Sequence, residues 1–292
     1  MADFEKRIKI GGLIIALKSE KNQGNFTIED SYRNFTTCDQ PHIILNLQYR
    51  DIPSVHGWKQ VFDSGGVWKL FQHDGKWAVC MYSPAYGTDP FQVAILENDF
   101  TCGEIFDTNS QSDHKSALFP LRYPLGEVLM INLMARGRGV LLHACAVKDA
   151  GKGLIFAGVS GGGKSTMARL WRTQDDAVVL SDDRVILRKR DGRYWLFGTP
   201  WHGDAHAASP QTVQLDEIFI LKHAPENQIV HLKPLEAATQ LFVRAFPTIW
   251  DQEGVDFTLG FLNDLVQSVP CYELGFVPDH SVLDFLRCQR SN

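Results

Sequence analysis

The chain has 292 residues, a formal net charge of -5 and an ordinary globular composition. This length favours two domains over one, at the usual ~100–200 residues per domain. The charge balance gives no support to nucleic acid or an anionic membrane surface as the principal partner. The charged start, Met1 to Arg7, is unlike a secretory signal, and no later apolar run approaches the ~20 residues of a membrane span, so we expect a cytoplasmic protein.

Residues 1–115 are predicted to form a β-rich domain. Short apolar or alternating runs are broken by Gly, Asn, Asp and Pro, and Ile43–Leu47 has a strand pattern. The runs Val67–Phe71 and Trp77–Met81 flank Asp74-Gly75, which predicts a hairpin. The aromatic residues favour sheet core and cross-strand pairs, with a ligand-stacking platform as the alternative; they include Trp58, Trp68 and Trp77.

Residues 116–292 are predicted to form an α/β nucleotide domain. An apolar helical pattern follows Pro124 and ends near Gly137. Next come two strand patterns, Val140–Val147 and Gly153–Ala157, whose connection is too short for a helical crossover. The two strands should therefore pair as an antiparallel hairpin.

The segment from Gly158 to Ser165 matches the phosphate-binding pattern Gly-x-x-x-x-Gly-Lys-Ser/Thr, and it stands between that hairpin and a helical run, Thr166–Arg172. Glycines let the loop wrap an anion with its backbone N–H groups. Lys164 should reach the terminal phosphates of ATP, and Ser165 should offer its hydroxyl to Mg²⁺. A plain glycine-rich turn would not explain Lys-Ser at this spacing. We expect the nucleotide to be bound by Gly158, Ser160, Gly161, Gly162, Gly163, Lys164, Ser165 and Thr166.

Beyond the loop, a buried strand over Ala177–Leu180 leads to a hairpin whose turn is Asp191-Gly192. A hairpin in place of a crossover helix predicts a mixed sheet. Gly198–His206 is too polar and too rich in turn formers for a strand, so we expect a loop near the site. The later predicted elements are a strand over Glu217–Leu221, a helix from Pro234 to before Pro247, a strand over Cys271–Phe276 and a short helix capped by Asp279.

Phosphoryl transfer needs a metal ligand and a group that orients or deprotonates the acceptor, besides the phosphate-binding loop. Asp182 and Asp183 follow the buried strand and suit these roles, with Asp182 and Ser165 as the expected Mg²⁺ ligands. Adjacent strand residues point to opposite sides, so one aspartate is expected to be functional and the other structural unless the strand has ended there. The alternative is a surface turn with an ion pair between Asp183 and Arg184. His143 faces away from Leu142 and Ala144; it is a catalytic candidate or a hydrogen-bonded core residue.

The residues Leu142-His143-Ala144, the loop Gly158–Ser165 and the run Leu180–Val185 together resemble the HPr serine kinase/phosphorylase family, whose core is shared with phosphoenolpyruvate carboxykinase. The resemblance covers the chain from about Val140 onward and implies a mixed-sheet P-loop domain. It also implies active-site roles for the histidine before the loop and the two aspartates after it. The glycine- and acid-rich signature of HPr kinases has no counterpart here, so we expect a divergent member.

The leading hypothesis is an ATP- and Mg²⁺-dependent phosphotransferase. It would act on a hydroxyl, preferably of a serine, in a peptide, protein or small molecule, with Asp182, Asp183 and His143 as catalytic residues. The alternatives are a nucleotide-binding regulatory or scaffold module without catalysis, and phosphoryl transfer of the carboxykinase type. Another copy of the chain is a further candidate partner.

Overall fold

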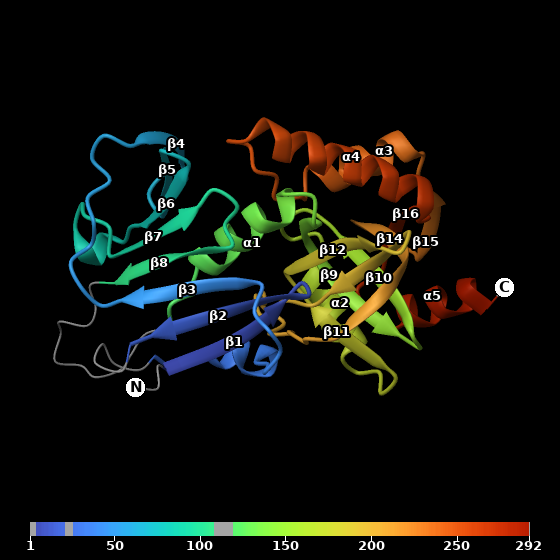
Figure 1. Cartoon of the computed structure of the whole chain (residues 1–292). Coiled ribbons are helices and arrows are strands. Elements are labelled where there is room, and N and C mark those ends of the chain that lie inside the picture. The colour runs from blue at the N-terminus through green and yellow to red at the C-terminus, as the bar shows by residue number, and fades with distance from the viewer. Residues whose placement is uncertain (1–3, 21–25, 108–118, 292) are drawn as a thin grey trace. The chain divides into compact units, whose positions relative to one another are not determined.

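The computed structural model describes residues 4–20, 26–107 and 119–291. By its internal contacts the chain divides into two compact units, Met1–Leu133 and Met134–Asn292. The boundary predicted at 115/116 lies outside the described residues. The structure is α/β with one mixed sheet in each unit, which agrees with the predicted class (Figure 1).

The first unit is built on a sheet of strand order β1-β2-β3-β8-β7-β6-β5-β4. In it β3 pairs parallel to both β2 and β8, and the other neighbours are antiparallel. Its elements are β1 (Phe4–Ile10), β2 (Leu13–Ser19), η1 (Asp30–Phe35), β3 (Ile43–Gln48), β4 (Lys59–Asp63), β5 (Trp68–His73), β6 (Lys76–Met81), η2 (Pro84–Tyr86), β7 (Gln92–Glu97) and β8 (Cys102–Asp107); α1 (Leu125–Ala135) spans the division between the units.

The hairpin predicted in this unit is confirmed as β5–β6. Its turn residues Asp74 and Gly75 have φ values of 45° and 73°, the positive values that a tight two-residue hairpin turn requires. Trp68 packs on Phe62 of the neighbouring strand with 4.7 Å between ring centroids. Trp77 is buried and packs on Phe100 at 5.6 Å. These two tryptophans therefore serve the sheet core and its cross-strand pairs.

The second unit holds the remaining elements along the chain. They are β9 (Val140–Asp149), β10 (Lys152–Ala157), α2 (Lys164–Trp171), β11 (Ala177–Ser181), β12 (Arg184–Arg190), β13 (Arg193–Phe197), β14 (Thr212–His223), β15 (Gln228–His231), α3 (Pro234–Phe242), α4 (Gln252–Ser268), β16 (Cys271–Phe276) and α5 (Ser281–Ser291). The predicted hairpins β9–β10 and β12–β13 are both confirmed as antiparallel pairs.

The long strand β9 organises this sheet. One edge of β9 pairs with β12 through Val140–His143 and with β11 further along, while the other edge pairs with β10. Strand β14 pairs parallel to β10 and β16, and its first residues pair with β13. The sheet is therefore mixed, and β9, β10 and β12 bring the residues before and after the glycine loop to neighbouring strands.

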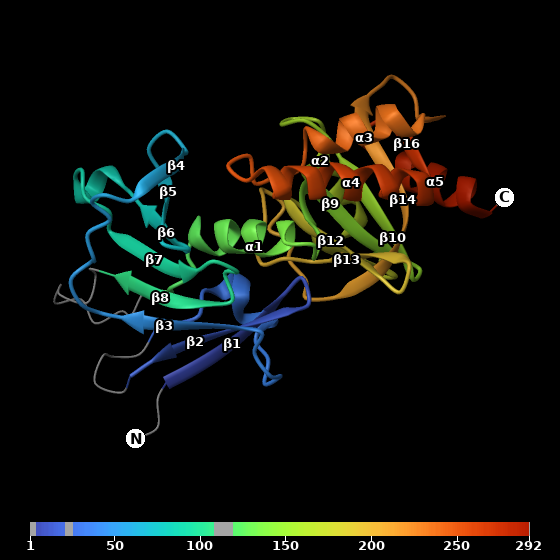
Figure 2. The ribbon, with the colours of Figure 1, turned by 45° about the horizontal axis from the view of Figure 1, so that its top comes forward.

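Helices cover both faces of this sheet (Figure 2). Residues of α3 and α4 pack on one face against Leu142, Ala144 and Ile155. Residues of α2 and α5 pack on the other face against Val147 and Phe156. Successive side chains of β9 point alternately to these two faces of the sheet. His143 therefore points away from the face that Leu142 and Ala144 share, as predicted, and it is half-buried.

The buried carboxylate of Asp149 fastens α5 to the end of β9. It is 1% exposed and forms ion pairs with Arg287 Nη2 at 2.6 Å and Arg290 Nη1 at 3.0 Å. Both guanidinium groups also lie over the ring of Trp171, the last residue of α2. The helix that begins at the glycine loop is thereby held at its far end.

Asp149→Ala should lower the free energy of unfolding by about 3–5 kcal/mol, because it leaves two arginines without the buried charge that they share. Urea denaturation followed by circular dichroism measures this loss. Asp176→Ala is the matched control, since Asp176 is an exposed partner of the same Arg287 and should change the midpoint little. Equal effects of the two variants would contradict the role of Asp149.

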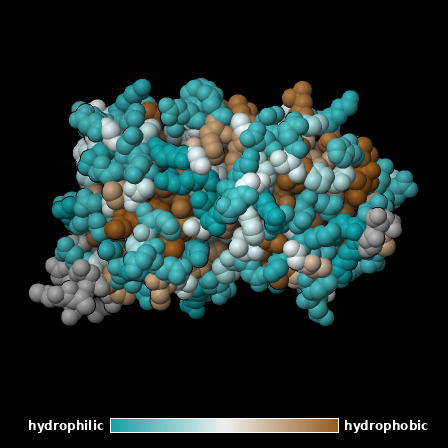
Figure 3. Space-filling model, turned by 45° about the vertical axis from the view of Figure 1, so that its right-hand side comes forward, coloured by the Kyte–Doolittle hydropathy of each residue, from teal (hydrophilic) through white to brown (hydrophobic). Residues whose placement is uncertain are grey.

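The described residues contain no helix that is long and apolar enough to cross a membrane. On the face drawn in Figure 3, hydrophilic residues cover most of the surface and hydrophobic ones form separate small groups. Several of the exposed apolar side chains belong to the second unit, among them Leu235, Val243, Ile249 and Leu259.

Candidate functional site

The segment between β10 and α2 has the strand–loop–helix context that the phosphate-binding pattern requires. Gly161 and Gly163 have φ values of 74° and 98°, in the left-handed region that favours glycine. A Cβ at Gly163 would come within 2.4 Å of Cζ of Phe276, so the loop also needs glycine here for space. The loop closes into the N-terminus of α2, where backbone N–H groups and the helix dipole favour an anion.

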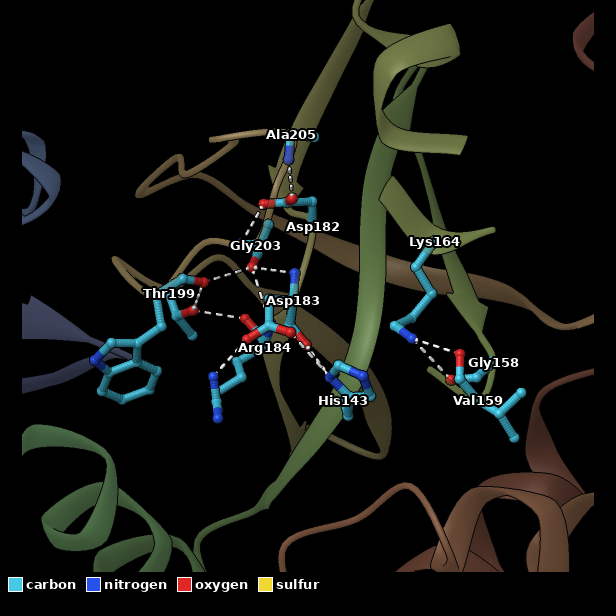
Figure 4. Close-up of polar contacts among 12 residues, drawn as sticks. His143, Gly158, Val159, Lys164, Asp182, Asp183, Arg184, Thr199, Gly203 and Ala205 are labelled. Atoms are coloured by element: carbon cyan, nitrogen blue, oxygen red, sulfur yellow. Dashed lines mark hydrogen bonds and ion pairs between the residues drawn. The ribbon is translucent and has the colours of Figure 1, made fainter. Parts of the chain in front are cut away.

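Lys164 is the first residue of α2 and is only 7% exposed. Its Nζ donates hydrogen bonds to the carbonyl oxygens of Gly158 and Val159, both at 2.9 Å (Figure 4). Burial lowers the pKa of the Lys164 ammonium, and the carboxylate of Asp183 opposes this effect. The ammonium therefore lies within the loop and interacts electrostatically with the carboxylate of Asp183.

His143 and Asp183 meet across the β9–β12 pair. His143 Nδ1 lies 3.0 Å from Asp183 Oδ1 and 3.1 Å from the Asp183 carbonyl oxygen, and Arg184 binds the other carboxylate oxygen. Burial favours the protonated acid, but the hydrogen bond from His143 and the charges of Arg184, His143 and Lys164 outweigh it. They hold the pKa of Asp183 below its usual range. Asp183 is thus a carboxylate within reach of an imidazole.

Asp182 points to the opposite side, toward the predicted loop Gly198–His206 (Figure 4). Its side chain is 1% exposed and accepts N–H groups from Gly203 at 2.9 Å, Ala205 at 2.8 Å and Ala207 at 3.2 Å. These bonds use most of the acceptor capacity of one carboxylate. The two aspartates lie in the bend between β11, which ends at Ser181, and β12, which begins at Arg184. Strand alternation therefore does not apply to them, but they still separate: Asp183 lies beside His143, and Asp182 binds the loop.

A pocket of ≈ 440 Å³ opens beside these groups. The start of the glycine loop forms one side, His143 and Arg184 form another, and the segment after α3 closes it; the lining residues are His143, Gly158, Val159, Ser160, Arg184, Val243, Arg244, Ala245 and Phe246. Arg184 lies over the Phe246 ring at 5.2 Å. The glycine loop and the two partners of Asp183, His143 and Arg184, therefore line the same pocket.

Arg244 is a site residue that the sequence analysis missed. It is 9% exposed, its Nη1 donates to Gln240 Oε1 at 2.8 Å, and its Nε has no hydrogen-bond partner among the described residues. Its carbonyl accepts the N–H of His143 at 2.8 Å, which ties the segment after α3 to β9. Burial lowers the pKa of the Arg244 guanidinium. A buried cation with a free donor is suited to an anionic ligand.

The two predicted metal ligands, Ser165 and Asp182, have different surroundings. Ser165 lies in the first turn of α2, while both oxygens of Asp182 accept N–H groups of the loop. Within residues 4–20, 26–107 and 119–291 no group of three or more His, Cys, Asp or Glu side chains is arranged to hold a metal ion. Among the candidate oxygen ligands, Ser165 follows Lys164 in α2, and the Asp183 carboxylate interacts electrostatically with Lys164.

Comparison with known proteins places the chain in a family. Residues 109–276 match the family described as "SynChlorMet cassette protein ScmC", which is more than half of the chain. The chain belongs to this family. The matched region of this family member includes the glycine loop, Asp183 and Arg244. No curated protein matches the chain.

Among solved structures, the HPr(Ser) kinase/phosphatase from Coxiella burnetii is similar at 11% sequence identity, over 52% of this chain and 92% of that one. Its TM-score is 0.30, which is too low to support an argument about activity. The functional assignment therefore rests on the residues of the site itself.

Proposed function

We propose that the second unit is an ATP- and Mg²⁺-dependent phosphotransferase that acts on a hydroxyl group, and that it is a divergent relative of the HPr serine kinases. The observation that carries this proposal is a single pocket lined both by the glycine loop and by His143 and Arg184, the two partners of Asp183. Phosphate binding and proton transfer then occur side by side, as phosphoryl transfer to a hydroxyl requires.

The glycine loop would hold the β- and γ-phosphates with its N–H groups and the N-terminus of α2. Lys164 would leave the carbonyl oxygens of Gly158 and Val159 and donate to the terminal phosphates instead. The loop carbonyls provide the ammonium with partners before the nucleotide arrives. Lys164 is therefore held close to where the phosphates would bind.

Asp183 is the proton acceptor in this proposal. The acceptor oxygen forms the new bond to the γ-phosphorus, its proton passes to the Asp183 carboxylate, and the bond to the β-phosphate oxygen breaks to release ADP. His143 orients that carboxylate through the 3.0 Å contact. The low pKa of Asp183 is compatible with this role, because phosphoryl transfer proceeds through a loose transition state in which positioning matters most.

Two arginines would stabilise the negative charge of the phosphoryl group during its transfer. Arg184 and the buried Arg244 both line it, and Nε of Arg244 has a donor to offer. Guanidinium groups bind phosphate oxygens with two donors at once, so this pair suits the transferred group or the phosphorylated product.

Mg²⁺ in such sites keeps several waters and uses few protein ligands together with nucleotide phosphates, and it would neutralise the charge that develops on them. The Ser165 hydroxyl and the Asp183 carboxylate would be the protein ligands. For Asp182 we propose loop anchoring instead of the metal binding expected from the sequence, because three N–H groups already occupy its oxygens.

The test is transfer of the γ-phosphate from radiolabelled ATP and Mg²⁺ to water, free serine and a library of serine-containing peptides. We expect label on a hydroxyl acceptor, and loss of that label in Asp183→Asn. Binding of the nucleotide with no release or transfer of phosphate to any of these acceptors would favour the alternative, a regulatory module.

A further inference from the structure

The glycine loop has two aromatic neighbours that the mechanism proposed above does not use. Strand β14 pairs parallel to β10 and to β16, so the ends of β14 and β16 lie beside the loop that follows β10. The last residues of these two strands are His223 and Phe276, which are cross-strand partners. The pairing of the strands therefore places an imidazole and a phenyl ring next to the loop.

His223 makes a hydrogen bond to the loop. Its Nε2 lies 3.2 Å from the carbonyl oxygen of Gly161, and Nε2 is the donor because a carbonyl oxygen only accepts. The imidazole is exposed and stacks on the buried ring of Phe276, with 5.3 Å between the centroids and 28° between the planes. This stacking restricts the imidazole to an orientation in which Nε2 points to Gly161.

Each of the three successive glycines in the loop has a partner in the structure. The carbonyl of Gly161 accepts from the imidazole, and the N–H of Gly162 donates to the carbonyl of Val159 at 3.0 Å. The φ of Gly161 is 74°, the positive value that type II turns have at this position. Phe276 lies against Gly163, where a Cβ would come within 2.4 Å of its Cζ. The peptide groups of the loop are thus oriented without a ligand.

The orientation of these peptide groups decides where the N–H groups for a phosphate point. The turn uses the N–H of Gly162, so the donors for an anion begin at Gly163 and continue with Lys164 and Ser165 in the first turn of α2. Rotation of the peptide group between Gly161 and Gly162 would redirect these donors. Glycine restricts such rotation less than any other residue, so a hydrogen bond from outside the loop is effective here.

We propose that His223 is a positioning residue of the nucleotide site, and that its hydrogen bond to Gly161 holds the glycine loop in the conformation that binds phosphates. This role rests on the function proposed above, in which the loop binds ATP. A loop that is already ordered loses less conformational entropy when the nucleotide binds, so its affinity is higher. The role needs the proton on Nε2 and no positive charge on the imidazole.

Three variants test this role. His223→Leu removes the hydrogen bond, whereas His223→Gln keeps a donor, because Nε2 of glutamine is as many bonds from Cα as Nε2 of histidine. His231→Leu is the matched control. His231 is also exposed and also packs on an aromatic ring of β16, Tyr272, at 5.4 Å between centroids, but it belongs to β15, on the other side of β16 from β14.

Isothermal titration calorimetry should show that His223→Leu binds Mg·ATP about 3–10-fold more weakly than the parent, which corresponds to the net worth of one hydrogen bond. His223→Gln and His231→Leu should bind nearly as the parent does. In steady-state transfer from ATP, His223→Leu should raise KM for ATP by the same factor and leave kcat unchanged, because the oriented loop serves the ground state and the transition state equally.

Amide hydrogen exchange without nucleotide gives a second readout. Peptides that cover residues 158–166 should exchange faster in His223→Leu than in the parent or in His223→Gln, while the other peptides keep the parent rates. The melting temperature without nucleotide should change by no more than ~2 °C, because the replaced side chain is exposed. A general loss of stability would instead raise exchange throughout the unit.

The proposal would be overturned if His223→Leu binds Mg·ATP as the parent does, or if its loop exchanges at the parent rate. It would also fail if His223→Gln is as defective as His223→Leu, since the charge or the ring of the histidine would then be what matters. A parent protein that binds no Mg·ATP would contradict the proposed function, whereas the exchange rates would still decide whether His223 holds the loop.

Discussion

Asp183→Asn should bind Mg·ATP nearly as the parent protein does and lose phosphate transfer by ~10²–10⁴-fold, the usual worth of a positioned proton acceptor. Asparagine keeps the size of aspartate but cannot accept a proton from the acceptor hydroxyl. The contact with His143 Nδ1 can survive through the amide oxygen, so the pocket should keep its shape. Single-turnover transfer of labelled phosphate, together with nucleotide titration, separates the two effects.

Asp182→Asn is the matched control, one residue away in the sequence. Its amide group would replace one of the oxygens that accept the N–H groups of Gly203, Ala205 and Ala207, which leaves a buried donor without an acceptor at about 1–3 kcal/mol. This variant should therefore be less stable, and the loop Gly198–His206 should become more susceptible to proteolysis. If Asp183→Asn transfers phosphate at the parent rate, or if both variants show the same defect, the division of roles is wrong.

Lys164→Ala should weaken binding of the terminal phosphates and reduce transfer by ~10²–10³-fold, because a charge-assisted contact is lost from a partly desolvated site. The fold should survive. Burial lowers the pKa of Lys164, so its charged form is disfavoured in the folded state and its removal relieves that cost at neutral pH.

Lys152→Ala is the control for this variant, since Lys152 is an exposed lysine at the start of β10, the strand that precedes the glycine loop. We expect parent-like nucleotide titration and transfer from Lys152→Ala. Full transfer activity in Lys164→Ala would show that the ammonium has no part in holding the phosphates.

Local patterns were sufficient to predict the elements around the site. The turns Asp74-Gly75 and Asp191-Gly192 combine residues that tolerate positive φ, so the hairpins on either side of them follow from local chemistry. The strand before Gly158 and the helix after it have the expected apolar periods. The mixed character of the sheet follows from the shortness of the connections.

Features that depend on contacts between distant parts of the sequence could not be predicted from local patterns. Helix α4 escaped prediction because Gly254 and Gly260 interrupt its helical pattern, and only the packing partner explains Gly254. Asp182 and Asp183 lie in a bend between two strands, so strand alternation does not set their directions, and which of them meets His143 depends on the pairing of β12 with β9. Arg244 carries no motif, and it reaches the pocket because the segment after α3 folds back onto His143.

The melting temperature in the presence of Mg·ATP tests the central claim, nucleotide binding at the glycine loop, most directly. A ligand at a hundred times its dissociation constant stabilises the folded state by about 2.7 kcal/mol. At ~2–4 °C per kcal/mol for units of ~150–250 residues, the melting temperature should rise by roughly 5–10 °C, and Lys164→Ala should lose most of this rise. A melting curve that saturating nucleotide leaves unmoved, with and without Mg²⁺, would contradict the proposed function.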